Sequence, residues 1–145
     1  MPFGEFVPYR SLLLPLVPEL AYVGAQSVPG MVPGALPVTL PDGRGTTLGI
    51  MVCYDLVYDD FAYDTVRYGG QLILVQSSNA MYQGTGQIEQ QFAITRARAM
   101  ELRREMLVVT TSGVSGLINA DGSVAFTGPE HVGASGVVTL PERTG

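Results

Sequence analysis

The single cysteine, Cys53, lies in the stretch GIMVCYDLVYDD and is the first candidate for chemistry. An apolar run of strand length ends at this cysteine, and acidic residues that suit the first turn of a helix follow it. A thiol at such a junction meets backbone N–H groups and a helix dipole, which favour a thiolate and can stabilise an oxyanion. Cys53 is therefore a candidate nucleophile, with a small buried hydrophobe as the alternative identity.

A thiol nucleophile needs a base, and the sequence supplies carboxylates more readily than imidazole. His131 is the only histidine, and its loop, TGPEHVGAS, is typical of a solvated position. Asp59 and Asp60 are explained by a helix start, where acids are favourable. Asn79 follows an apolar run, where it either caps a turn or orients a substrate. The acids available to serve as a base are Glu5, Asp55, Asp59, Asp60, Glu89 and Glu130.

Composition excludes several other classes of function. One cysteine cannot form an internal disulfide, and one cysteine with one histidine is too few for a zinc site. The formal net charge is −5 and every basic residue is arginine, without a basic stripe, so nucleic acid is not an expected partner. The most apolar stretch, LLLPLVPELAYV, is broken by prolines and a glutamate, so no membrane span is predicted.

Hydrophobic patterning predicts the elements that position Cys53. Residues 1–45 are rich in proline and glycine and read as loop, with a helical turn near 10–14 and a short strand near 38–40. Continuous apolar runs then predict three buried strands, at residues 46–55, 71–78 and 106–113.

Two helices are predicted between these strands, over residues 59–70, which end in a glycine pair, and over residues 87–105. The arginines of the second helix are predicted to form its solvated edge: Arg96, Arg98, Arg103 and Arg104. Residues 116–126 predict a hairpin with a turn at Asp121-Gly122, and residues 134–141 a final strand.

This order of elements is that of an α/β fold with a partly parallel sheet. Ligands collect at the carboxyl ends of parallel strands, and Cys53, residues 77–79 and residues 110–112 all follow predicted strands. We therefore expect these segments to converge in space.

Five stretches resemble, in order and spacing, the carbon–nitrogen hydrolase (nitrilase) superfamily: PFGEFVPYRSLL, GIMVCYD, LVQSSNAMYQG, QQFAITRARAMELRR and TTSGVSGLINADGSV. Within it they most resemble the apolipoprotein N-acyltransferase family. The resemblance implies the C-terminal half of a four-layer αββα sandwich with a mixed sheet. Residues 1–145 would form a partial domain, with a loop-rich segment at 1–45 that carries the PFGE motif and a βαβαβ core with a hairpin and final strand at 46–145.

The resemblance also implies a site. Cys53 corresponds to the nucleophile that forms a thioester, and Glu5 of the PFGE motif to an accessory carboxylate. Tyr54 and Asp55 match the two residues after the nucleophile, where Asp55 replaces the more usual glutamate, and Asn79 would support the site. The family's catalytic lysine and proton-shuttling glutamate would precede the PFGE motif, and this sequence has no lysine. We therefore expect a fragment of a longer enzyme that is inactive alone.

By resemblance, the parent enzyme moves an acyl chain from a phospholipid, through the cysteine, to the N-terminal amine of a bacterial lipoprotein. The expected location is the extracytoplasmic face of the bacterial plasma membrane, without metal or organic cofactor. Expected partners are the phospholipid, the lipoprotein and the missing N-terminal half of the domain, with self-association of the fragment. The alternatives are a soluble nitrilase-type amidase that acts on a small amide, and a non-catalytic remnant.

Overall fold

The computed structural model describes residues 7–22, 30, 32–129 and 132–139, and the chain divides into two units, Met1–Met31 and Val32–Gly145. The first unit contains the short helix α1 (Arg10–Leu13) and the 3₁₀ turn η1 (Pro18–Tyr22). The predicted helical turn is thus confirmed. It ends just ahead of Pro15, because proline has no N–H to donate to the Ser11 carbonyl and so cannot continue the helical hydrogen bonds.

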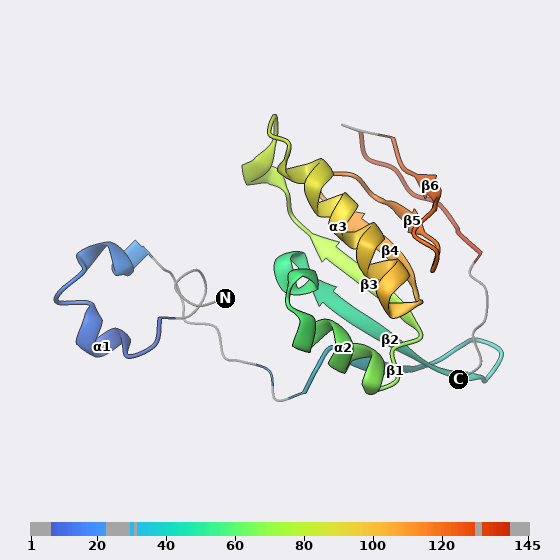
Figure 1. The fold of residues 1–145 in the computed structure, drawn as a ribbon, viewed down its shortest axis with the longest axis horizontal. Coiled ribbons are helices and arrows are strands. Elements are labelled where there is room, and N and C mark those ends of the chain that lie inside the picture. Colours follow the sequence, from blue (N-terminus) through green and yellow to red (C-terminus); the bar gives the residue numbers. More distant parts are fainter. Residues whose placement is uncertain (1–6, 23–29, 31, 130–131, 140–145) are drawn as a thin grey trace. The chain divides into compact units, whose positions relative to one another are not determined.

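The second unit is built on a six-stranded mixed sheet in the order β1-β2-β3-β4-β5-β6 (Figure 1). The central strands β2, β3 and β4 are parallel, and the outer pairs β1·β2, β4·β5 and β5·β6 are antiparallel. The strands are β1 (Ala35–Thr39), β2 (Gly45–Val52), β3 (Leu72–Ser77), β4 (Glu105–Thr110), β5 (Gly116–Ile118) and β6 (Val124–Thr127). The α/β class and the mixed sheet are as predicted.

Helices α2 (Asp59–Arg67) and α3 (Gln87–Leu102) connect the parallel strands and lie together on one face of the sheet (Figure 1). Successive right-handed crossovers that progress in one direction across a sheet place their helices on the same side. The core lies between these helices and the sheet and is formed by Met51, Leu56, Ala62, Ile73, Val75, Ala99, Leu102, Met106, Val108 and Ile118.

The two faces of the central strands are buried to different degrees. In β3, Ile73 and Val75 are buried against the helices, whereas the alternating Leu72 and Leu74 face the other way and are only partly buried. At the ends of the neighbouring strands, Val52 and Val109 are each 54% exposed. The apolar runs thus supply one core face and one partly exposed apolar face.

Several predicted elements have other ends in the structure: the strand near 38–40 is β1, the strand over 106–113 ends at Thr110, and the helix over 59–70 ends at Arg67. Two more end early for a reason that the backbone shows. The strand expected over 46–55 ends at Val52, because the backbone turns at Cys53. The helix expected over 87–105 ends at Leu102, because Arg103 adopts a left-handed conformation with φ 51°. The Arg104 N–H then bonds the Ala99 carbonyl at 3.2 Å and closes the helix.

The hairpin is confirmed, with Gly122 at φ 79° in its turn, but the final strand is wrong over its described part. Residues 134–139 form no strand, and Val137 is fully exposed. A β-rich sequence becomes a strand only when a neighbouring strand supplies ladder hydrogen bonds and packing. Residues 140–141 of that prediction lie outside the described part of the chain.

Candidate active site

Cys53 begins a tight 3₁₀ turn, η2 (Cys53–Val57), which directly follows β2 and is called the elbow below. Its φ is 53°, in the left-handed region, which costs a residue other than glycine about 1–2 kcal/mol. The free thiol belongs to a half-buried residue. Strained residues of this kind concentrate at active sites, where the surrounding structure holds them.

Asp55 closes the elbow. Its Oδ2 accepts a hydrogen bond from the Val52 N–H at 2.9 Å, so the carboxylate holds the chain on either side of Cys53. Leu56 is fully buried and anchors the far side of the turn, whereas Tyr54 is 47% exposed. Asp55 therefore fixes the backbone around the thiol. A glutamate at this position would have to make the same hydrogen bond with a side chain that is longer by one methylene.

The carboxyl ends of the parallel strands meet at one edge, as predicted. Gln91 of α3 donates from Nε2 to the Cys53 carbonyl at 3.1 Å and to Ser77 Oγ at 3.3 Å, which links the ends of β2 and β3. The Thr111 N–H bonds the Ser77 carbonyl at 3.1 Å and joins the end of β4. The Thr111 hydroxyl donates to Ser78 Oγ, also at 3.1 Å.

Asn79 is almost fully buried at this edge. It precedes the short turn η3 (Ala80–Tyr82), but its side chain makes no capping bond, so the capping interpretation is wrong. Its Oδ1 instead accepts a hydrogen bond from the Ser77 hydroxyl at 2.8 Å. A Cβ on Gly113, in the loop that follows β4, would lie 2.5 Å from Asn79 Nδ2. The absence of a side chain at this position therefore leaves room for the Asn79 amide.

Arg98 contradicts the prediction of a solvated arginine edge, because it is 9% exposed. Its guanidinium donates to the Leu56 and Val57 carbonyls of the elbow at 2.7 and 2.9 Å. It also pairs with Asp59 and with Glu101, each at 2.5 Å. A buried charge is tolerated only when its donors are satisfied, which these four acceptors achieve.

The other arginines of that prediction also have specific roles. Arg96 donates from Nε to the Gly122 carbonyl of the hairpin turn at 2.9 Å, and Arg104 to the Gly70 carbonyl at 3.2 Å. Arg103 takes the left-handed position that ends α3.

The charges around Arg98 perturb one another. Burial lowers the pKa of Arg98, but its hydrogen bonds to Asp59 and Glu101 outweigh burial and raise the pKa overall. Hydrogen bonds from Tyr63 and Arg98 lower the pKa of Glu101, and the same Glu101 contact raises the pKa of Tyr63. Glu101, which is itself part of α3, is therefore held ionised next to Arg98.

The remaining candidates are distributed as follows. Glu5, Glu130 and His131 lie outside the described residues. Asp59 and Asp60 occupy the first turn of α2, as expected. Over the part of the chain that the structure describes, no three histidine, cysteine, aspartate or glutamate residues are grouped so as to hold a metal ion.

Sequence reasoning placed Ser77 at this edge but missed Gln91 and Arg98 as parts of the site. Gln91 and Arg98 are seven residues apart, so two turns of helix place them on one face. That spacing was the available signal, but a glutamine and an arginine among other polar residues predict only solvent exposure.

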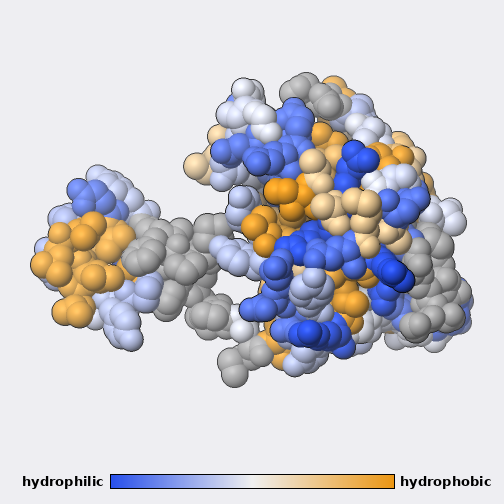
Figure 2. All heavy atoms as spheres, viewed as in Figure 1, coloured by the Kyte–Doolittle hydropathy of each residue, from blue (hydrophilic) through white to orange (hydrophobic). Residues whose placement is uncertain are grey.

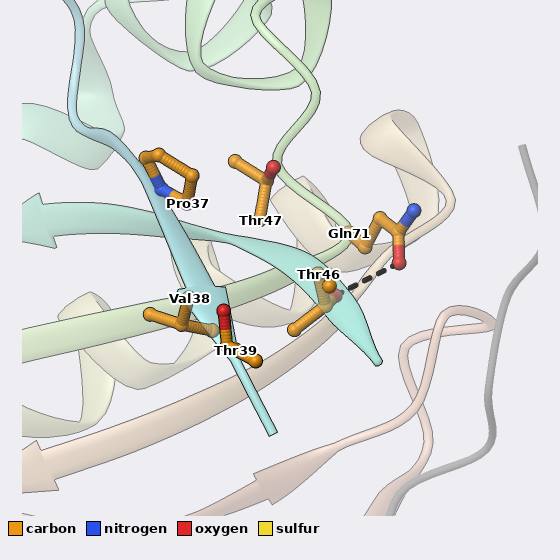
Figure 3. Close-up of a pocket in the computed structure, with 7 residues that line it drawn as sticks. Pro37, Val38, Thr39, Thr46, Thr47 and Gln71 are labelled. Atoms are coloured by element: carbon orange, nitrogen blue, oxygen red, sulfur yellow. Dashed lines mark hydrogen bonds between the residues drawn. The ribbon is translucent and has the colours of Figure 1, made fainter. Parts of the chain in front are cut away.

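Two pockets lie beside the sheet, and the second includes Thr110 and Thr111 at the edge where the parallel strands end. One of ≈ 370 Å³ lies at the other end of β2, beside the Thr46–Gln71 hydrogen bond (Figure 3), and is lined by Pro37, Val38, Thr39, Gly45, Thr46, Thr47 and Gln71. The second, of ≈ 1170 Å³, is lined by residues 83–86, the end of β4 with the loop after it, and residues 132–136, among others. Neither is lined by Cys53, so the elbow is a site at the sheet edge and not the floor of either pocket.

Among the described residues, no helix combines the length and the apolar character that crossing a bilayer requires.

Comparison with known proteins shows which family the chain belongs to. A sequence profile described as Carbon-nitrogen hydrolase matches residues 10–139. The apolipoprotein N-acyltransferase of Mycolicibacterium smegmatis is 32% identical over 121 residues, which are 83% of this chain and 19% of that protein. That of Shewanella oneidensis is 27% identical over 145 residues, which are 100% of this chain and 27% of that protein. The chain thus spans about a quarter or less of the length of these relatives.

Solved structures agree on the fold. A carbon-nitrogen hydrolase from Helicobacter pylori superposes with a TM-score of 0.58 at 17% identity, over 71% of this chain and 42% of that chain. A mutant amidase from Nesterenkonia, solved with the acetamide moiety of fluoroacetamide added covalently at its active-site cysteine, gives 0.55 at 23% identity, over 71% and 40%. The resemblance seen in the sequence motifs is confirmed: the chain belongs to the carbon-nitrogen hydrolase family, and the curated relatives it matches are apolipoprotein N-acyltransferases.

Proposed function

We propose that this chain is the nucleophile-bearing part of an N-acyltransferase that carries a phospholipid-derived acyl chain on Cys53 and delivers it to the N-terminal amine of a bacterial lipoprotein. The observation that carries the proposal is the strained, half-buried Cys53 at the edge where three parallel strand ends meet. The relatives named apolipoprotein N-acyltransferase supply the substrate class.

In the first half-reaction, the Cys53 thiolate attacks the ester carbonyl carbon of the phospholipid. The carbon–sulfur bond forms, the carbon–oxygen bond to the glycerol breaks, and the oxygen of the leaving lysophospholipid takes up the proton that a base removed from the Cys53 thiol. A soft sulfur nucleophile suits this step because it yields a thioester that remains reactive toward amines.

In the second half-reaction, the lipoprotein amine attacks the thioester carbonyl. An amide bond forms, the carbon–sulfur bond breaks, and the amine gives up a proton to a base. Glu5, from the PFGE motif, is proposed as an accessory carboxylate. Tyr54, Asp55 and Asn79 support the site, with Asp55 holding the elbow and Asn79 the end of β3.

The N-terminal unit has a surface suited to lipid. Tyr9, Leu12, Leu16 and Tyr22 are between 69% and 91% exposed. Figure 2 shows hydrophobic side chains gathered on this unit, whose helix is labelled α1 in Figure 1. Burial of apolar surface of this kind in acyl chains is favourable, at about 25 cal/mol per Å². We place the enzyme at the extracytoplasmic face of the bacterial plasma membrane on this basis and by its relatives.

We further propose that the 145 residues are inactive alone. The sequence has no lysine, and removal of one oxyanion-stabilising donor typically costs about 10²–10³-fold in rate. The chain matches about 40% of the solved carbon-nitrogen hydrolase chains, and we propose that the remainder of such a domain would cover the partly exposed apolar face of the sheet. In its absence we expect the chain to self-associate, which light scattering would detect. A monodisperse monomer would contradict this part.

The test of function uses the product of the complete gene in detergent micelles, incubated with a phospholipid that carries a fluorescent acyl chain. We expect fluorescence on the protein that neutral hydroxylamine removes, and none on Cys53→Ala. A parallel incubation with small amides, monitored by ammonia release, tests the amidase alternative. Ammonia release without acyl labelling would favour the amidase and contradict the proposal.

The same incubation with the 145-residue chain tests its predicted inactivity. We expect no turnover above the Cys53→Ala background, which would also describe a non-catalytic remnant. Robust turnover that Cys53→Ala abolishes would contradict the inactivity of the isolated chain.

A further inference from the structure

Helix α3 contacts the elbow through two side chains, Gln91 and Arg98. They are seven residues apart, so both lie on the helix face that meets the elbow. Both donate to backbone carbonyls, at Cys53, Leu56 and Val57. The contacts therefore fix the path of the backbone at both ends of the turn.

Gln91 acts at the start of the elbow. Its amide nitrogen bonds the carbonyl of Cys53 itself and the hydroxyl of Ser77, so the nucleophile's peptide unit is tied to the end of β3. The Ser77 hydroxyl in turn donates to Asn79. Rotation of the Cys53 backbone out of its left-handed conformation would turn its carbonyl and so disturb this chain of bonds.

Arg98 acts at the far end of the elbow. Its planar guanidinium reaches the Leu56 and Val57 carbonyls from different nitrogens, while Asp59 and Glu101 hold it by charge. A lysine has a single ammonium and cannot reproduce this fork. Hydrogen bonds from a charged, buried donor are also stronger than neutral ones.

We infer that Gln91 and Arg98 are positioning residues that hold the strained elbow and thereby keep the Cys53 sulfur at the sheet edge where an acyl carbon arrives. The strain at Cys53 requires such support, because an unsupported residue would relax toward negative φ. The catalytic part of this inference rests on the proposed function of Cys53.

The chain offers matched controls. Arg96 lies on the same helix and also bonds a backbone carbonyl through Nε, but that carbonyl belongs to Gly122 in the hairpin turn. Gln90 is exposed and adjacent to Gln91. The set is therefore Arg98→Met, Arg98→Lys and Gln91→Met, with Arg96→Met and Gln90→Met as controls.

Hydrogen–deuterium exchange is measured on peptides that cover the elbow and on peptides that cover the hairpin turn. We expect Arg98→Met to accelerate exchange at the elbow by about tenfold, because it removes the hydrogen bonds to the Leu56 and Val57 carbonyls, with little change at the hairpin. Arg96→Met should accelerate exchange at the hairpin turn and leave exchange at the elbow nearly unchanged. Arg98→Lys should be intermediate at the elbow, and Gln91→Met should accelerate exchange there while Gln90→Met does not.

Equal acceleration at elbow and hairpin in Arg98→Met would show a general stabilising role and overturn the inference. An unchanged elbow in Arg98→Met or Gln91→Met would also overturn it.

The catalytic part is measured on the product of the complete gene, as the rate of Cys53 acylation by the fluorescent phospholipid. We expect Arg98→Lys and Gln91→Met to lower kcat about tenfold or more with KM unchanged, because a 1 Å misplacement can cost that much. Normal kcat in a variant with a loosened elbow would refute the catalytic part. If the unmodified protein acylates nothing while the exchange pattern holds, the proposed function fails and the support of the elbow stands.

Discussion

The left-handed backbone at Cys53 predicts an unusual response to glycine. At an ordinary position, replacement of alanine by glycine destabilises a protein, because glycine loses more backbone entropy on folding. At φ 53°, however, any residue with a Cβ is strained, and glycine is not. We therefore expect Cys53→Gly to be more stable than Cys53→Ala.

The magnitude follows from two opposing effects. Relief of the left-handed strain contributes about 1–2 kcal/mol. The additional entropy of glycine in the unfolded chain removes about 0.5–1 kcal/mol. The net gain of Cys53→Gly over Cys53→Ala is thus about 0.5–1 kcal/mol, equivalent to about 2–3 °C in Tm for a chain of this length.

The assay is unfolding in urea at fixed protein concentration, with Ala97→Gly as the control. Ala97 is exposed within α3, where glycine should cost about 1 kcal/mol. The two glycine substitutions should therefore have opposite signs. If Cys53→Gly is less stable than Cys53→Ala by as much as the control, Cys53 has ordinary backbone angles and the strained elbow is refuted.

Three further outcomes are expected. Asp55→Ala should lower the free energy of unfolding in urea by about 1 kcal/mol, because it leaves the Val52 N–H without its acceptor. Asp55→Asn keeps an acceptor oxygen and should recover most of this loss, whereas equal losses in both variants would contradict the role of Asp55 in holding the elbow. Gly113→Ala should cost about 1–3 kcal/mol in urea unfolding, since its Cβ would displace Asn79, and a neutral effect would show that the loop can move. Because the pKa of Glu101 is lowered in the fold, its contribution to stability is present above its ordinary value of 4.5 and is lost as pH falls below it. The urea midpoint should therefore fall less below pH 4.5 in Glu101→Gln than in the parent, whereas parallel curves would assign acid sensitivity elsewhere.

Sequence reasoning recovered the elements whose signals are local. The apolar runs of β2, β3 and β4 and the Asp121-Gly122 turn carry their structure in consecutive residues. The convergence at Cys53 then followed from the rule that parallel strands end at one edge. The Gly69-Gly70 pair predicts the end of α2, and in the structure Gly69 adopts φ 97°, which favours glycine.

The parts that could not be predicted depend on partners distant in the sequence. Arg98 is buried because the Leu56 and Val57 carbonyls, 41–42 residues earlier, accept its donors. No local pattern distinguishes it from the exposed arginine Arg67, which pairs with Asp64 three residues earlier on α2. The strand predicted over 134–141 is wrong over its described part for a related reason. Its residues have a strand-like apolar pattern, but residues 134–139 have no neighbouring strand with which they pair.

The most direct test of the central claim is the location of the acyl group. The product of the complete gene is incubated with phospholipid, denatured, digested and sequenced by mass spectrometry. The account predicts an acyl thioester on the peptide that contains Cys53, which hydroxylamine removes and the lipoprotein amine discharges. An acyl group on another residue, or one that persists in Cys53→Ala, would contradict it.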